Sequence, residues 1–243
     1  MKIGLAQIKS VTGDVKQNIN HHLRVLDHVA ERNADLVMFP ELSLCNYDPD
    51  IANSVAMEPD DIRLRPFQQF ADRTEVAVGV GIPMRTSSNP LISITVFFPN
   101  RTKTIINKFY LHEDELPFFS ASSEPPASIL DMSKKIAVSI CYEIDIDAHI
   151  ETAASKGMDV YLASVAKTPV GIKEARARMS IQANRFRVPV MVVNSVGTCE
   201  GKTAGGGSMV IGADGTVLNA LDDKEEAVLF YDFKMKTTQT VAM

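Results

Sequence analysis

Three residues with reactive side chains each follow a short, mostly apolar run of the chain. Glu41 comes after residues 36–40, and Lys108 and Cys141 stand at the ends of similar runs further along. Short apolar runs of this length are typical of buried strands. In open α/β sheets, functional residues gather beyond the carboxyl ends of the strands. The spacing therefore suggests that a carboxylate, an ammonium group and a thiol meet at one place.

Together these three groups suit covalent hydrolysis by a cysteine. A thiol attacks as the thiolate, a neighbouring carboxylate can take its proton, and a cation can stabilise negative charge that develops on a carbonyl oxygen. Each residue alone also has an ordinary structural role. Most free cysteines are small buried hydrophobic residues, and most lysines and glutamates are exposed surface residues.

The apolar runs alternate with helical patterns, which predicts an α/β fold of helices layered on sheet. Apolar positions spaced by three and four residues predict a helix over residues 15–32. Further helices are predicted at 59–74, 145–157 and 173–187. Strands are predicted at 2–8, 35–39, 76–82, 91–98, 102–108, 135–140, 159–163 and 189–194.

The remaining segments are less regular. Residues 109–134 show no clear period and contain three prolines, so a long loop is predicted there. Two or three strands are predicted after the glycines at 205–207, broken by a turn at 213–216. No repeat, linker or shift of composition marks a boundary, and residues 1–243 are interpreted as a single domain.

Three segments, in this order, resemble the signature segments of the nitrilase superfamily, the carbon–nitrogen hydrolases. They are Phe-Pro-Glu-Leu at 39–42, Asn-Lys-Phe-Tyr-Leu at 107–111 and Ile-Cys-Tyr-Glu at 140–143. The first strand is also similar to that family, as are segments 177–184, 193–197, 205–211 and 214–215, so the resemblance covers nearly the whole chain.

The resemblance implies a four-layer α-β-β-α sandwich and a Glu-Lys-Cys triad made by Glu41, Lys108 and Cys141. The family has a second glutamate shortly after the lysine, and Glu115 fits it best, with Glu113 as the alternative. In this chemistry Glu41 is the general base and then the acid, Lys108 stabilises the oxyanion, and the backbone N–H of Tyr142 is a second donor. No metal or organic cofactor is required.

The chain also departs from the family pattern. Asp145 stands near the position of a family arginine, Asp147-Ala148 replaces a Pro-Glu pair, and Tyr110 occupies the place of a histidine. Lys167 follows a predicted strand and either binds a substrate carboxylate or is a solvated loop lysine, which is the favoured interpretation. Arg176 and Arg178 are expected to form ion pairs.

Several other functions are disfavoured by the sequence. The net charge is −5, which does not favour a nucleic-acid surface. No apolar run is long enough to span a membrane, and the start of the chain is expected to be a strand rather than a signal peptide. Three scattered cysteines and five histidines indicate neither a disulfide framework nor a metal site, and a reducing cytoplasm is expected.

Two sequence motifs are also set aside. The segment 197–203 is one residue short of a phosphate-binding loop, and a strand-like stretch follows it instead of a helix. The Gly-x-Ser-x-Gly elbow of serine hydrolases does not occur in the sequence.

The predicted function is hydrolysis of a non-peptide carbon–nitrogen bond in a small amide, ω-amide or carbamoyl compound. An amidase is the first choice, ahead of a carbamoyl hydrolase and a nitrilase. The alternative is a catalytically silent binding or regulatory protein on the same fold. The resemblance also implies a homodimer or larger homo-oligomer, with the tail 241–243 either joining the subunit contact or disordered.

Overall fold

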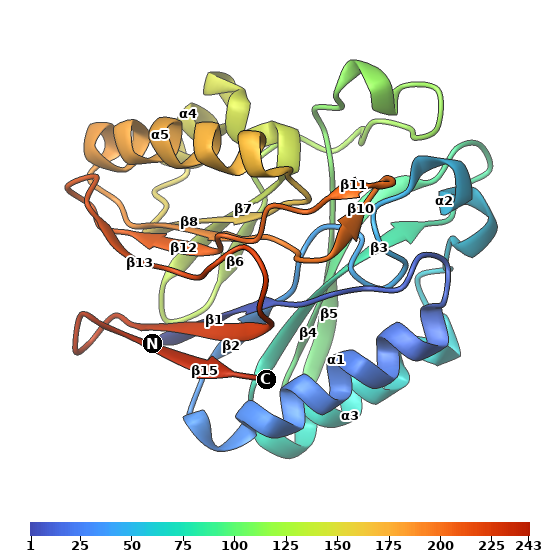
Figure 1. Cartoon of the computed structure of the whole chain (residues 1–243), viewed down its shortest axis with the longest axis horizontal. Helices are drawn as coiled ribbons and strands as arrows, with labels where there is room; N and C mark the ends of the chain where they lie inside the picture. The colour runs from blue at the N-terminus through green and yellow to red at the C-terminus, as the bar shows by residue number, and fades with distance from the viewer.

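Two β-sheets face each other in the computed structural model, which describes residues 1–243, and helices cover both outer faces (Figure 1). The first sheet has seven strands. β1, β2 and β3 run parallel, and the other neighbours are antiparallel. In spatial order the strands are β15 (Thr237–Ala242), β14 (Ala227–Asp232), β1 (Lys2–Gln7), β2 (Leu36–Met38), β3 (Ala77–Met84), β4 (Leu91–Phe98) and β5 (Arg101–Asn107).

The second sheet has six strands, of which β7, β8 and β9 are parallel. Its spatial order is β13 (Val217–Ala220), β12 (Met209–Ile211), β9 (Val190–Val193), β8 (Val160–Ser164), β7 (Lys135–Ile140) and β6 (Ile129–Asp131). A separate hairpin joins β10 (Thr198–Cys199) to β11 (Lys202–Thr203).

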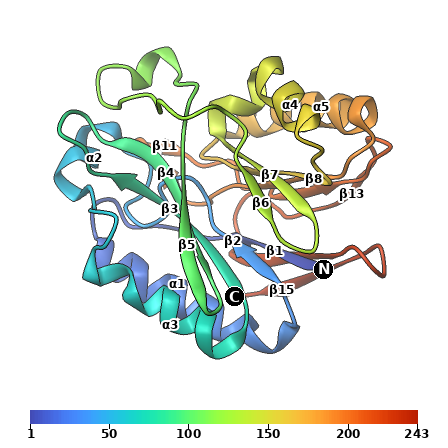
Figure 2. The same cartoon turned by 180° about the vertical axis from the view of Figure 1, so that it is seen from behind.

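Helices α1 (Val15–Val29) and α3 (Arg65–Thr74) cover the first sheet, and α4 (Asp147–Ser155) and α5 (Pro169–Phe186) cover the second (Figure 2). The fold is therefore the four-layer α-β-β-α sandwich that the resemblance implied. A shorter helix, α2 (Pro49–Val55), lies at one end. Four 3₁₀ turns complete the chain: η1 (Ala30–Arg32), η2 (Ile62–Leu64), η3 (Glu113–Glu115) and η4 (Cys141–Asp145).

The central strands are apolar along their length because both of their faces are buried. In β7, Ile136, Val138 and Ile140 belong to the core between the two sheets. Ala137, which alternates with them, belongs to a second core beneath α4 and α5. This alternation fixes the register of the strand and hence the position of Cys141 at its end.

Helix starts account for several differences from the sequence prediction. Helix α5 begins at residue 169 and not 173, because the Thr168 side chain caps it and Pro169 occupies the first turn. Helix α2 was not predicted, although Asp48 and Pro49 give it the same signal. The predicted helix 59–74 is a 3₁₀ turn followed by α3, and the predicted helix 145–157 is shortened to α4.

Other differences lie in the irregular segments. The prediction of an unstructured loop over 109–134 is wrong in part, because it contains η3 and the edge strand β6. Four strands follow the glycines at 205–207 in place of two or three. Val241 and Ala242 pair in β15, so the tail is not disordered. None of the helices is both long and apolar enough to span a membrane, and no group of three or more His, Cys, Asp or Glu side chains could hold a metal ion.

Candidate active site

Lys108 lies between two buried carboxylates. Its Nζ is 2.9 Å from Glu41 Oε1 and 2.6 Å from Glu115 Oε1. The side chains of Lys108 and Glu41 are fully buried, and that of Glu115 is 2% exposed. The second carboxyl oxygen of Glu41, Oε2, is buried and has no hydrogen-bond partner. A buried acceptor without a partner lowers the stability of the fold, so its presence points to a role such as catalysis.

The backbone after β2 places Glu41. Leu42 has a φ of 49°, in the left-handed region, which turns the chain sharply after the glutamate. The turn crosses directly over Gly81 of β3, where an added Cβ would lie 2.4 Å from Pro40 O and 2.3 Å from Leu42 N. Only glycine at this position lets the two backbones approach so closely.

Cys141 begins the turn η4 at the end of β7. Its φ of 45° is in the left-handed region, which non-glycine residues adopt rarely and mostly where the surrounding structure requires it. The residue as a whole is partly exposed, and its Sγ lies 4.0 Å from the carbonyl oxygen of Ala166. A strained turn therefore presents the thiol beside a set of buried charges.

Of the two candidates for the second glutamate, Glu115 is the one that contacts Lys108. Glu115 Oε1 accepts a hydrogen bond from the Tyr47 hydroxyl at 2.9 Å as well as from Lys108, and its Oε2 accepts the backbone N–H of His112 at 2.8 Å. Glu113 is exposed at the start of the same 3₁₀ turn.

Burial and neighbouring charges shift the pKa of each of the three groups in the site. Burial raises the pKa of the Cys141 thiol, and the charge of Glu41 raises it further, against Lys108 and Lys167. Burial also raises the pKa of Glu41, although Lys108 opposes that shift. Burial alone would lower the pKa of Lys108, but the charges of Glu41, Cys141 and Glu115 raise it. The thiol consequently needs a partner to take its proton as it attacks.

Glu143 is a buried residue that the sequence analysis missed. Its Oε2 accepts the N–H of Ile140 at 2.8 Å, and its Oε1 accepts the N–H groups of Phe109 at 2.8 Å and Tyr110 at 3.3 Å. It therefore joins the end of β7 to the segment after Lys108. One signal could have found it, namely an acid two residues after the cysteine.

Lys167 is not the solvated loop lysine that the sequence analysis favoured. Its side chain is 14% exposed, and its Nζ lies 3.0 Å from Asp145 Oδ2. Tyr142 follows Cys141 in η4, and the role of its N–H stays a prediction. Arg178 pairs with Asp147 as predicted, whereas the ion pair predicted for Arg176 is absent.

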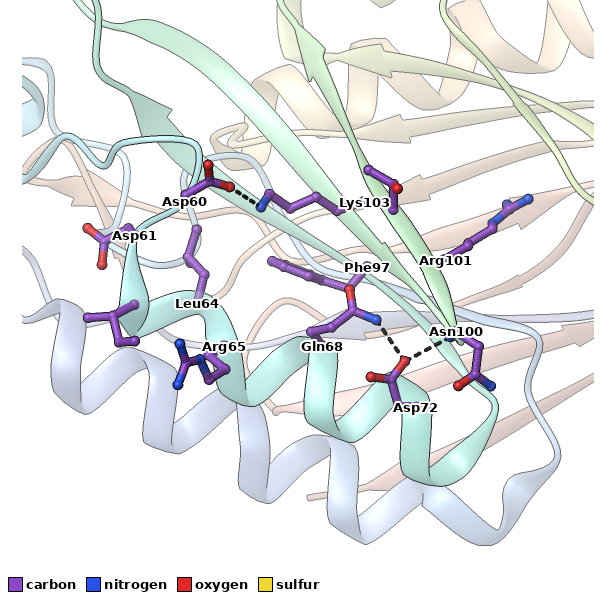
Figure 3. A pocket seen from close by; sticks show the side chains of 12 residues that line it. Asp60, Asp61, Leu64, Arg65, Gln68, Asp72, Phe97, Asn100, Arg101 and Lys103 are labelled. Atoms are coloured by element: carbon purple, nitrogen blue, oxygen red, sulfur yellow. Dashed lines mark hydrogen bonds and ion pairs between the residues drawn. The ribbon is translucent and has the colours of Figure 1, made fainter.

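A separate groove of about 620 Å³ lies between α3 and the strands β4 and β5 (Figure 3). It sits at the end of β5 opposite Lys108. Lys103 pairs with Asp60 at 2.9 Å, and Asp72 accepts hydrogen bonds from Gln68 and from the backbone of Asn100, each at 2.8 Å. These polar groups satisfy one another, and the groove contains no cysteine.

Known proteins are similar to this chain along nearly its whole length. The family model described as carbon-nitrogen hydrolase matches residues 2–243. A glutamine-dependent NAD(+) synthetase of Thermotoga maritima is 24% identical over 100% of this chain, which spans only 44% of that protein. A probable nitrilase of Schizosaccharomyces pombe, C965.09, is 25% identical over 94% of this chain and 87% of its own length.

One further relative and one solved structure are also similar to this chain. A chloroplastic omega-amidase of Arabidopsis thaliana is 26% identical over 64% of this chain and 46% of its own length. A structure of the amidase from Nesterenkonia sp. AN1 has a TM-score of 0.86 at 20% identity, over 96% of this chain and 93% of that chain. This likeness shows a shared fold.

Proposed function

The chain belongs to the carbon–nitrogen hydrolase family, and from that premise we propose that it hydrolyses a small amide through a thioester on Cys141. The observation that carries the proposal is the buried Lys108 held between Glu41 and Glu115, with the unpartnered Oε2 of Glu41 in the same site as the thiol. This arrangement supplies a nucleophile, a proton acceptor and a fixed cation.

In the first half of the proposed reaction, Cys141 Sγ forms a bond to the amide carbon while its proton passes to Glu41. The negative charge that develops on the amide oxygen is stabilised by the Lys108 ammonium and the Tyr142 N–H; one such donor typically contributes about 3–4 kcal/mol. The carbon–nitrogen bond then breaks as Glu41 returns its proton to the leaving nitrogen. Ammonia or an amine departs, and a thioester remains.

In the second half, a water attacks the thioester carbon and gives a proton to Glu41. The carbon–sulfur bond breaks, the thiolate regains a proton from Glu41, and a carboxylic acid leaves. One carboxylate thus acts as base and acid twice. Glu115 and Tyr47 keep Lys108 in place through both halves.

The relatives support an amide substrate of modest size. They include a protein named omega-amidase, a protein named for its dependence on glutamine, and a probable nitrilase. In a structure of a mutant of the amidase of Nesterenkonia sp. AN1, acrylamide has added to the active-site cysteine by Michael addition. We place amide hydrolysis ahead of carbamoyl hydrolysis and nitrile hydrolysis for this chain.

The test compares the wild type, Cys141→Ala and Cys45→Ala, in which a second free cysteine is removed, by following ammonia release. The substrates are primary amides, ω-amides, N-carbamoyl amino acids and nitriles. The proposal expects release by the wild type and Cys45→Ala, and none by Cys141→Ala. Release that survives in Cys141→Ala would overturn the role of Cys141 as the nucleophile. Silence of every protein, together with a Cys141 that iodoacetamide does not alkylate, would instead favour a binding protein on this fold.

A further inference from the structure

An ion pair between Asp145 and Lys167 flanks the nucleophile. Asp145 ends the turn η4 that Cys141 begins, and Lys167 follows Ala166, whose carbonyl oxygen is 4.0 Å from Cys141 Sγ. Lys167 Nζ and Asp145 Oδ2 are 3.0 Å apart. The two charges therefore approach the thiol from two different elements of the second sheet.

Lys167 is held rigidly by its backbone. Its N–H donates to Asn194 Oδ1 at 2.9 Å, and its carbonyl oxygen accepts hydrogen bonds from Asn194 Nδ2 at 3.0 Å and from Gly205 N–H at 2.8 Å. The turn that carries Asp145 is anchored as well, because Arg178 Nε donates to Ile144 O at 3.0 Å. A pair fixed on both sides is suited to recognition, since little ordering is needed when a ligand binds.

The pair also has unused hydrogen-bonding capacity. A lysine ammonium has three N–H donors, and only the one directed to Asp145 is used within the protein. Asp145 accepts no other hydrogen bond. The two side chains are 14% and 35% exposed, whereas those of Lys108 and Glu41 are sealed from solvent. The pair is thus the part of the site that an arriving molecule can reach.

We propose that Asp145 and Lys167 together bind the dipolar head of an ω-amide that carries both a carboxylate and an ammonium group, the carboxylate against Lys167 and the ammonium against Asp145. This inference rests on the proposed amide hydrolysis at Cys141 and names its substrate class. A substrate that carries only a carboxylate meets Lys167 but is repelled by Asp145 at close range. A substrate without charges gains from neither residue.

The signs of the two charges support this assignment. One cation and one anion lie side by side next to the thiol, and both side chains are partly exposed. This arrangement matches the two charges of an α-amino acid head.

The test uses a series in which one group is removed at each step: L-glutamine, its desamino analogue glutaramate, and butyramide, with L-asparagine and succinamate as a shorter pair. We expect kcat/KM of the wild type to be at least about tenfold higher for the amino acid than for its desamino analogue, as for a hydrogen bond to a charged group. Asp145→Asn should reduce that ratio about tenfold, and Asp145→Arg should invert it.

Glu151→Gln is the matched control, because Glu151 also forms an ion pair, with Arg185, but on the outer helices and 49% exposed; it should leave the ratio unchanged. Preference of the wild type for glutaramate or butyramide would overturn the inference. An equal loss of kcat/KM on all three substrates in Asp145→Asn would also overturn it, because Asp145 would then only support the structure of the site. If these results overturned the inference but butyramide were still hydrolysed in a Cys141-dependent way, the proposed amide hydrolysis would stand. If no amide were hydrolysed at all, the proposed function and this inference would both be overturned.

Discussion

Glu143 accepts the backbone N–H of Phe109 with one carboxylate oxygen at 2.8 Å, which ties the cysteine turn to the chain just after Lys108. The other oxygen accepts the N–H of Ile140, directly before Cys141. The nucleophile and the cation stand on different sheets, and this carboxylate joins their backbones. Ser164 adds a second link between the sheets, because its hydroxyl donates to Phe39 O at 2.9 Å, two residues before Glu41.

Replacing Glu143 with glutamine is expected to lower both stability and activity. The amide group of glutamine can accept hydrogen bonds with only one of its two terminal atoms, so its NH₂ would face a backbone N–H. Loss of a hydrogen bond to a buried charge costs about 1.5–3 kcal/mol. We expect Glu143→Gln to lower the free energy of unfolding in urea by about 2–3 kcal/mol, with kcat reduced more than KM is raised. Stability and activity like those of Glu151→Gln would show that Glu143 does not join the two segments.

Gly81 provides a second prediction, about the placement of Glu41. A Cβ at Gly81 would meet the backbone of the Glu41 turn, which cannot move without moving the carboxylate. We expect Gly81→Ala to cost about 3 kcal/mol of folding free energy, at the upper end for overpacked sites, and to reduce kcat/KM at least about tenfold, as displaced catalytic groups do.

Gly79→Ala is the control for this prediction, since Gly79 lies two residues earlier in the same strand. Its Cβ would meet only the flexible end of the Met38 side chain, at 2.5 Å from Sδ. The expected cost is about 1 kcal/mol, with activity nearly retained. If Gly79→Ala lost as much activity as Gly81→Ala, general overpacking of the core would explain both variants.

The sequence predicted most of the first-sheet and second-sheet strands because their faces are apolar and their lengths short. It also placed Glu41, Lys108 and Cys141 at strand ends, where the structure has them. The resemblance favoured Glu115 but left Glu113 open, and the difference in burial between them depends on how η3 folds back onto Lys108. Local pattern carries no information of that kind.

The partners of the site residues were harder to predict. Glu143 and Asp145 are three and five residues from Ile140, yet one turns inward to bind backbone N–H groups and the other outward to meet Lys167. The opposite directions of these two side chains depend on the 3₁₀ geometry of η4. Lys167 was misjudged because its partners are distant in the sequence: Asp145 pairs with its side chain, and Asn194 and Gly205 bind its backbone.

His22 gives a prediction about stability in acid. The ring is buried, its Nδ1–H donates to Asn18 O, and its Nε2 lies 2.9 Å from the Ser43 hydroxyl. Burial lowers the pKa of His22 from 6.5 to about 3. The unfolded chain therefore binds one more proton than the folded one between these values. Stability from this group is full above pH 6.5 and falls as the pH drops towards 3, by about 1.4 kcal/mol per unit.

We expect His22→Gln to be less stable than the wild type at pH 7.5 but to lose less stability per pH unit on acidification. Urea unfolding between about pH 7.5 and 4.5 measures both quantities, within the window that the shifted pKa defines. His28→Gln, which removes an exposed imidazole from the same helix, should follow the wild type. An acid slope in His22→Gln equal to that of the wild type would assign the acid sensitivity to other groups.

The last prediction concerns the acid side of the activity profile. Burial raises the pKa of Glu41, and the charge of Glu115 raises it further while Lys108 lowers it. Glu41 must be ionised to take the thiol proton, so kcat/KM should fall in acid with an apparent pKa above the ordinary 4.5 of a glutamate. Because the buried carboxylates and Lys108 interact, this apparent pKa belongs to the group as a whole.

Glu115→Gln removes one negative charge beside Glu41 and should shift this acid limb to lower pH, although kcat itself will be reduced. Tyr47→Phe is the matched control, because it removes a hydrogen bond to Glu115 but keeps the charge. Its acid limb should coincide with that of the wild type. A limb that stays in place in Glu115→Gln, or moves to higher pH, would mean that the group titrating on the acid side is not Glu41.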